Sequence, residues 1–266
     1  MSRGSAPLGA ALVPLLLVPL APAQEGRSEC ETEVVATAAG DVCGLRLDVD
    51  GALVVEDPLP AAVAGRTEVP VVWGNNDHEA FSFLGRLVPD DIGPSLGDAM
   101  TTVLFGKEAG EVMRQRYLRG AEDLSAAVLD AAGDYVFMCP ALLAAMNAPV
   151  GYHYRFSHPP QYSGSLTGGE NCRDEACHAA ELPFVFGTGR FPNGFTASDE
   201  RVSATSMGLW AAFARGDGDD GGGFSAWPAA EVADGGLPTL VISDPPRQVH
   251  HDVARCAAWT ATYSLP

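Results

Sequence analysis

Three short apolar runs, separated by long stretches with helical spacing, constrain the fold of this chain most strongly. The runs are VPVVWGN at 69–75, PVGYHYRFSH at 149–158 and LPTLVIS at 237–243. Each is rich in β-branched or aromatic residues and has the length of a buried strand. The helical patterns lie between and after them, at 98–118, 121–147, 198–216 and 248–265. Strands that alternate with helices predict an α/β sheet.

The small number of strands is itself informative. Three strands are too few for a typical doubly wound sheet, because a parallel sheet with an open edge leaves ladder groups and apolar faces uncovered. We therefore expect an incomplete sheet of few, mostly parallel strands with flanking helices. A further part of the same domain is expected to pack against it.

The charge of the chain limits its partners. Its 266 residues include 16 Lys and Arg against 34 Asp and Glu, which gives a formal net charge of -18. Such a surface repels duplexes and anionic membranes, so we expect no nucleic-acid partner. The acidic run GDGDDGGG at 216–223 lacks the spacing and terminal Glu of an EF-hand, which favours a solvated loop over a calcium site. No metal site is expected.

The first 23 residues are typical of a secretion signal. Arg3 is the single positive charge of the N-terminal region, and ALVPLLLVPLA at 11–21 forms the apolar region. Ala21-Pro22-Ala23 matches a cleavage pattern. The segment is too short for a membrane span. The pattern predicts a secreted or periplasmic protein whose mature part is 24–266. A misplaced start codon is the alternative, because the apolar region contains two prolines.

The cysteines indicate an oxidising compartment. Their even number, without a CxxC pair, favours disulfides over a zinc or redox site. Disulfides between cysteines close in sequence would join Cys30 to Cys43 and Cys172 to Cys177. Cys139 would then pair with Cys256. The sequence alone leaves the connectivity open.

Seven segments carry a resemblance to a known family. They are VDGALVVEDPLPAAVAGRTEVPVVWGNNDHEAFSF, FMCPALLAAM, YHYRFSH, ACHAAELPFVFGT, SATSMGLWAAFARGDG, WPA and RCAAWTA. In order and spacing, from about Leu47 to the C-terminus, they resemble the type-B carboxylesterases, the cholinesterase-like branch of the α/β-hydrolases. The resemblance implies the C-terminal part of an α/β-hydrolase fold. It also implies hydrolysis of a small-molecule ester without any cofactor.

The resemblance places the catalytic acid at Glu79. The segment GNNDHEA at 74–80 matches the family pattern Gly-x-Asn-x-x-Glu-Gly, with Ala80 in place of the usual Gly and His78 where an Asp is common. Glu79 follows the strand expected at 69–75, as the acid of an α/β-hydrolase does. Asp77 remains its competitor.

The resemblance places the catalytic base at His178. Its segment is similar to the family's Cys-His-Gly-x-Glu-Leu, with Ala179 in place of Gly. A base beyond the acid is the chain order expected of this fold. A glutamate that accepts a hydrogen bond from one imidazole nitrogen fixes the tautomer and leaves the other nitrogen to deprotonate a hydroxyl. The remaining candidates are interpreted as structural or exposed, namely His153, His158, His250 and His251.

The resemblance also bears on the disulfides. A bridge from the Cys-Pro segment to the last helix is a family feature, which implies the pair Cys139 and Cys256. The pair Cys172 and Cys177 then closes a tight loop directly before His178.

A nucleophile is not identifiable. The sequence before Glu79 contains neither a Gly-x-Ser-x-Gly elbow nor a glycine-rich oxyanion run. GPSLG at 93–97 fits the elbow around Ser95, but it follows the acid, has no apolar strand before it, and Pro94 restricts the turn. Ser95 is assigned to a helix start.

Three interpretations of this pattern stay open. The chain is a portion of a secreted ester hydrolase whose N-terminal half is missing, an inactive remnant, or a non-catalytic binding module.

Overall fold

The computed structural model describes residues 34–37, 40–43, 51–52, 54–160, 172, 174–189, 194–216, 227–233 and 236–263. The chain divides into two units, residues 1–57 and 58–266. The first contains an antiparallel hairpin of β1 (Val34–Thr37) and β2 (Gly40–Cys43). The predicted signal segment 1–23, Cys30 and the acidic residues 217–220 lie outside the described residues, so the predictions about them remain predictions.

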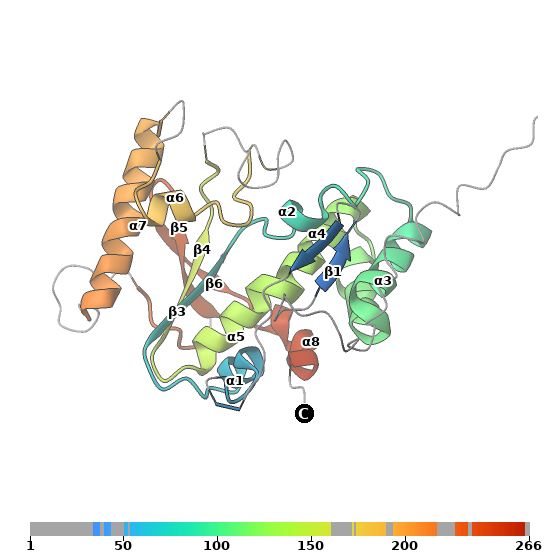
Figure 1. Cartoon of the computed structure of the whole chain (residues 1–266), viewed down its shortest axis with the longest axis horizontal. Helices are drawn as coiled ribbons and strands as arrows, with labels where there is room; N and C mark the ends of the chain where they lie inside the picture. Colours follow the sequence, from blue (N-terminus) through green and yellow to red (C-terminus); the bar gives the residue numbers. More distant parts are fainter. Residues whose placement is uncertain are drawn as a thin grey trace, which may run out of the picture. The chain divides into compact units, whose positions relative to one another are not determined.

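The second unit is built on a four-stranded sheet (Figure 1). Its strands are β3 (Val71–Asn76), β4 (Gly151–Phe156), β5 (Leu237–Ile242) and β6 (Arg247–His251), in that spatial order. β3, β4 and β5 are parallel, and β6 is antiparallel to β5. The prediction of a small, mostly parallel sheet is confirmed.

Helices cover both faces of this sheet. The helical elements of the second unit are α1 (Pro58–Val63), α2 (Phe81–Leu84), α3 (Pro94–Met113), η3 (Arg114–Leu118), α4 (Leu124–Gly133), η4 (Asp134–Met138), α5 (Cys139–Asn147), α6 (Leu182–Val185), α7 (Ala197–Arg215) and α8 (Ala254–Tyr263). α5 and α8 lie on one side of the sheet and α7 on the other (Figure 1).

Each face has its own core because side chains alternate along a strand. On the α5 side, Leu142, Leu237 and Trp259 are fully buried. On the α7 side, Phe156 and Ile242 pack with the helix. A third cluster joins α3, η3 and α4. These cores hold the C-terminal ends of β3 and β4, where the site residues lie.

Residues 247–251 form a strand, so the prediction of a helix beginning at 248 is wrong there. Exposure alternates along β6, with Gln248 and His250 exposed and Val249 between them half-buried, which is the period of a strand. The helix begins at Ala254, whose backbone N–H donates to the carboxylate of Asp252 at 2.9 Å.

The helix α7 is capped at both of its ends. Thr196 is the N-cap, and its side chain and that of Asp199 form a reciprocal capping box. The helix ends at Arg215, and the C-cap Gly216 has a φ of 76° in the left-handed region that terminates a helix.

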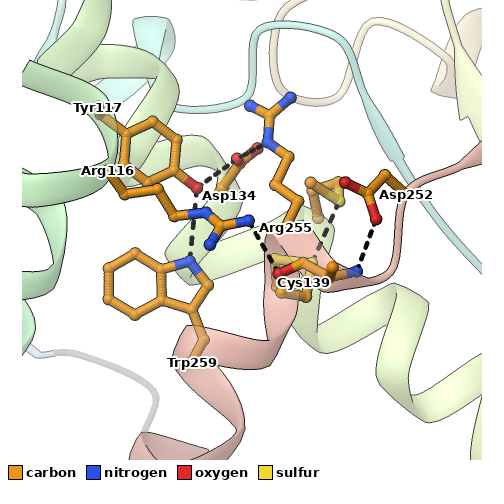
Figure 2. The surroundings of a disulfide bond; sticks show 10 residues. Arg116, Tyr117, Asp134, Cys139, Asp252, Arg255 and Trp259 are labelled. Carbon is orange, nitrogen blue, oxygen red and sulfur yellow. Dashed lines mark hydrogen bonds and ion pairs between the residues drawn. A yellow bond between two sulfur atoms is a disulfide. The ribbon is translucent and has the colours of Figure 1, made fainter.

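The terminal helix is fastened to the helical layer by a disulfide and a polar network (Figure 2). Cys139 at the start of α5 is bridged to Cys256. Beside the bridge, Asp134 accepts hydrogen bonds from Tyr117 at 2.6 Å and from Arg255. Burial, and then the nearby charge of Asp134, raise the pKa of Tyr117 to about 12.

The helical stretch Leu124–Asn147 is long and apolar enough to cross a membrane by length and composition. Within its 18-residue apolar window, 67% is buried inside the protein, which is the pattern of a core helix.

Candidate active site

The acid turn follows β3 directly. After Asn76 the chain turns through residues 77–80, and Glu79 is only 6% exposed. Its carboxylate accepts a hydrogen bond from the backbone N–H of Asn76 at 2.7 Å and contacts Nδ1 of His178 at 2.6 Å. The two residues that the sequence singled out therefore lie in direct contact.

The protonation of this pair follows from its chemistry. When Glu79 is ionised, its carboxylate only accepts, so Nδ1 of His178 carries the hydrogen and Nε2 is left as the acceptor. Burial raises the pKa of Glu79, while the hydrogen bonds from Asn76 and His178 act in the opposite direction. His178 is more open, with 43% of its side chain exposed. The arrangement can orient an imidazole and hold a proton at Nε2.

The segment at 174–179 that carries His178, called the base loop below, is attached to the acid turn by backbone contacts. Cys177, directly before His178, is bridged to Cys172. The backbone N–H of His78 donates to the carbonyl of Ala176 at 3.0 Å, and His78 and Cys177 form a parallel β-bridge. Ala179, where the sequence departs from the glycine pattern, has a φ of 65° in the left-handed region. Glycine adopts that region without strain.

Asp77, the competing acid, is bound elsewhere. Its Oδ1 lies 2.7 Å from Nε of Arg155 and accepts a hydrogen bond from Ser157 at 2.9 Å. Both partners come from the end of β4 and the residue after it. Asp77 thus fixes the acid turn to the neighbouring strand and leaves His178 to Glu79.

Two phenylalanines stand beside the imidazole. The ring centroids of Phe83 and Phe137 lie 4.9 Å and 5.3 Å from that of His178. Phe83 is 54% exposed. Sequence reasoning missed both residues, because one lies in α2 and the other in η4 and only tertiary packing brings them together.

A second carboxylate adjoins the pair. Glu181 accepts a hydrogen bond from Nδ2 of Asn76 at 2.6 Å. Its charge adds to the rise in the pKa of Glu79. Burial, and then the charges of Glu181 and Glu79, also raise the pKa of Tyr154.

A polar cavity of about 270 Å³ is lined by the acid turn itself, Glu79 included. Its lining includes Asn75, Asp77, Arg155, His251 and Arg255. Within the described residues, no cluster of three or more His, Cys, Asp or Glu could hold a metal ion.

The other histidines have structural surroundings. His153 is buried within β4, where its Nδ1 bonds to Thr239 at 3.0 Å, and burial lowers its pKa to about 3. His158, after β4, is buried against Asp199 at 2.7 Å. His250 and His251 lie on β6, and not on the terminal helix as predicted.

Ser95 lies in the first turn of α3, as the sequence indicated. Among the described residues, no serine is hydrogen-bonded to His178.

Comparison with known proteins gives a consistent result. The sequence model of the Carboxylesterase family matches residues 23–259. The chain is 28% identical over 191 residues to the acylcarnitine hydrolase of Rattus norvegicus. This match covers 65% of this chain and 32% of the relative. It is 29% identical over 206 residues to the cocaine esterase of Homo sapiens. That match covers 68% of this chain and 35% of the esterase. The chain thus spans about a third of the length of these relatives.

The solved structure of a PNB esterase is similar, with a TM-score of 0.55 and 23% identity over 75% of this chain and 40% of that one. This likeness shows the fold, so the prediction that the chain has part of an α/β-hydrolase fold is confirmed.

Proposed function

Since this chain belongs to the carboxylesterase family, we propose that it supplies the acid and the base of a carboxylic ester hydrolase that transfers an acyl group to water. The observation that carries the proposal is the 2.6 Å contact between Glu79 and Nδ1 of His178. In this mechanism Nε2 of His178 removes the proton of a serine hydroxyl and then gives it to the leaving alcohol. Glu79 orients the ring and stabilises its charged form.

The serine is proposed to come from a strand that pairs along the edge of β3 opposite β4, where the described residues supply no neighbouring strand. The backbone N–H of Val71 and that of Asp77 donate to the β4 side, so by alternation the N–H groups of Val72, Gly74 and Asn76 point to the opposite edge. The N–H of Asn76 reaches Glu79, which puts the acid on this open side. A serine elbow at the end of a neighbouring parallel strand approaches from the same side.

The substrate is proposed to carry an apolar group beside the scissile ester. The rings of Phe83 and Phe137 flank His178 and offer an apolar surface next to the base. The named substrates of the relatives, an acylcarnitine and cocaine, differ widely and give the class only. The bridges Cys139–Cys256 and Cys172–Cys177 support an oxidising compartment, and hence the proposed export.

The test is a fusion of this chain to the serine-bearing N-terminal half of a related carboxylesterase. We expect hydrolysis of p-nitrophenyl esters that is abolished by His178→Ala and reduced by about four orders of magnitude by Glu79→Gln. His250→Ala, at an exposed position on β6, is the matched control. Turnover that survives His178→Ala, or a folded fusion without turnover, would contradict the proposal.

Exposed apolar side chains favour non-catalytic protein binding as a second candidate function. Phe186 is 69% exposed, Leu182 46% and Met207 42%, and all three line one groove between α6 and α7. Large exposed apolar patches are typical of interaction sites. Specific retention of a protein partner that is lost in Phe186→Ser, without any ester turnover, would favour this candidate.

A further inference from the structure

A second contact joins the same two segments as the Glu79–His178 pair. Nε2 of His78 lies 2.9 Å from Oε2 of Glu175, with 29% and 45% of the two side chains exposed. His78 directly precedes Glu79, and Glu175 lies inside the loop closed by Cys172 and Cys177. The contact therefore spans from the acid turn to the base loop.

The surroundings of His78 fix its ring in this direction. Its backbone is held by the carbonyl of Ala176, and its ring packs edge-on against Phe81 at 4.9 Å. Nδ1 of His78 is buried without a hydrogen-bond partner within the described part of the chain. Nε2 is thus the ring atom that forms the hydrogen bond to Glu175. It is the donor, because the carboxylate of Glu175 only accepts.

We infer that His78 is a positioning residue, which holds the disulfide loop in the place where His178 meets Glu79. The inference rests on the proposed function, because it concerns how that pair is kept in contact. The effect of the residue at position 78 on this loop depends on its contact with Glu175. An aspartate at 78, which is common in the family pattern, would place a second negative charge against Glu175 and push the loop away. A hydrogen-bond donor at 78 is what this particular loop requires.

The experiment measures, by NMR of the whole chain, the rate at which the Nδ1 proton of His178 exchanges with water. We expect His78→Asp to raise the rate about five-fold or more, because it replaces an attraction by a repulsion. His78→Gln keeps an N–H donor and should stay within about two-fold of the parent chain. The double variant His78→Asp/Glu175→Lys reverses the polarity and should restore the parent rate, which a loss of packing at position 78 would not allow.

His250→Asp places the same new charge on an exposed histidine of β6 and should leave the rate unchanged. A parent-like rate in His78→Asp, or no restoration in the double variant, overturns the inference. If His78→Asp does not fold, Glu175→Ala reports on the same contact and should also raise the rate. Glu79→Gln separates the two proposals, because a parent-like rate in that variant refutes the Glu79–His178 pair itself, whatever position 78 does.

Discussion

Glu79 is a carboxylate whose burial opposes its charge and whose hydrogen-bond partners act in the opposite direction. Burial alone would favour the protonated acid, since desolvation raises the pKa of this group. The donors Asn76 and His178 act against that rise, each through one carboxylate oxygen. These two hydrogen bonds thus offset part of the desolvation of the carboxylate.

Ala179 offers a direct test of strain in the base loop. Its φ of 65° costs an L-residue about 1–2 kcal/mol, whereas glycine lacks this penalty but has the more flexible unfolded chain. We expect Ala179→Gly to raise the free energy of unfolding by about 0.5–1 kcal/mol, measured by chemical denaturation. Ala180→Gly, one residue further and without a positive φ, should instead destabilise the chain.

His153 predicts acid sensitivity. Burial lowers its folded pKa to about 3 from the ordinary value of 6.5, so the unfolded chain binds the proton more readily. The stability from the neutral ring is present above pH 6.5 and is lost as the pH falls towards 3. Burial also lowers the pKa of His251, to about 4, and adds to the loss.

The measurement is the free energy of unfolding as a function of pH. His153→Gln should flatten the curve between pH 6.5 and 3. An unchanged slope in this variant would rule out His153 as its origin. His250→Gln, at an exposed position, should leave the curve as it is.

At the scale of elements, α7 is anchored through its first turn. Asp199 serves both the capping box with Thr196 and the buried contact with His158. Thr196→Ala should cost about 1 kcal/mol of stability, because it removes only the cap. Asp199→Ala should cost about 3 kcal/mol, because it also leaves His158 buried without its partner. Thermal unfolding compares the two, with the exposed Glu200→Ala as control, and equal losses in both variants would contradict the double role.

The elements that the sequence predicted well are those with a strong local period. The strands at 71–76 and 237–242 and the helix at 197–215 lie within about two residues of the expected bounds. Residues 247–251 were missed, because a short polar strand is stabilised by its ladder with β5 and not by its own composition. The kink at Gly106 and the five-residue π-helix at 114–118 likewise interrupt a continuous helical pattern.

The residues of the site also differ in whether a local sequence pattern reveals them. Glu79 and His178 could be named because each lies in a recognisable segment. The contacts of Asp77 with Arg155, and of His78 with Glu175, join residues about 80 and 100 positions apart in the chain, and no local pattern reports them.

At the scale of the whole molecule, the two described disulfides act over very different lengths of chain. The bridge Cys139–Cys256 spans 117 residues and Cys172–Cys177 only 5. Loop-closure entropy then predicts a loss of about 5 kcal/mol when the first pair is replaced by alanine and about 2 kcal/mol for the second. Chemical denaturation of the two double variants measures the difference, and a larger loss from the short bridge would show that local contacts dominate.

The two outer strands of the sheet are unlike each other. β6 is only five residues long and exposes Arg247, Gln248 and His250, which discourages another strand from adding there. β3 has no such protection among the described residues, so it is the one edge at which the sheet can grow. Two copies that paired through β3 would leave no receptive edge behind. Self-association by strand pairing should therefore stop at a dimer and not extend into filaments.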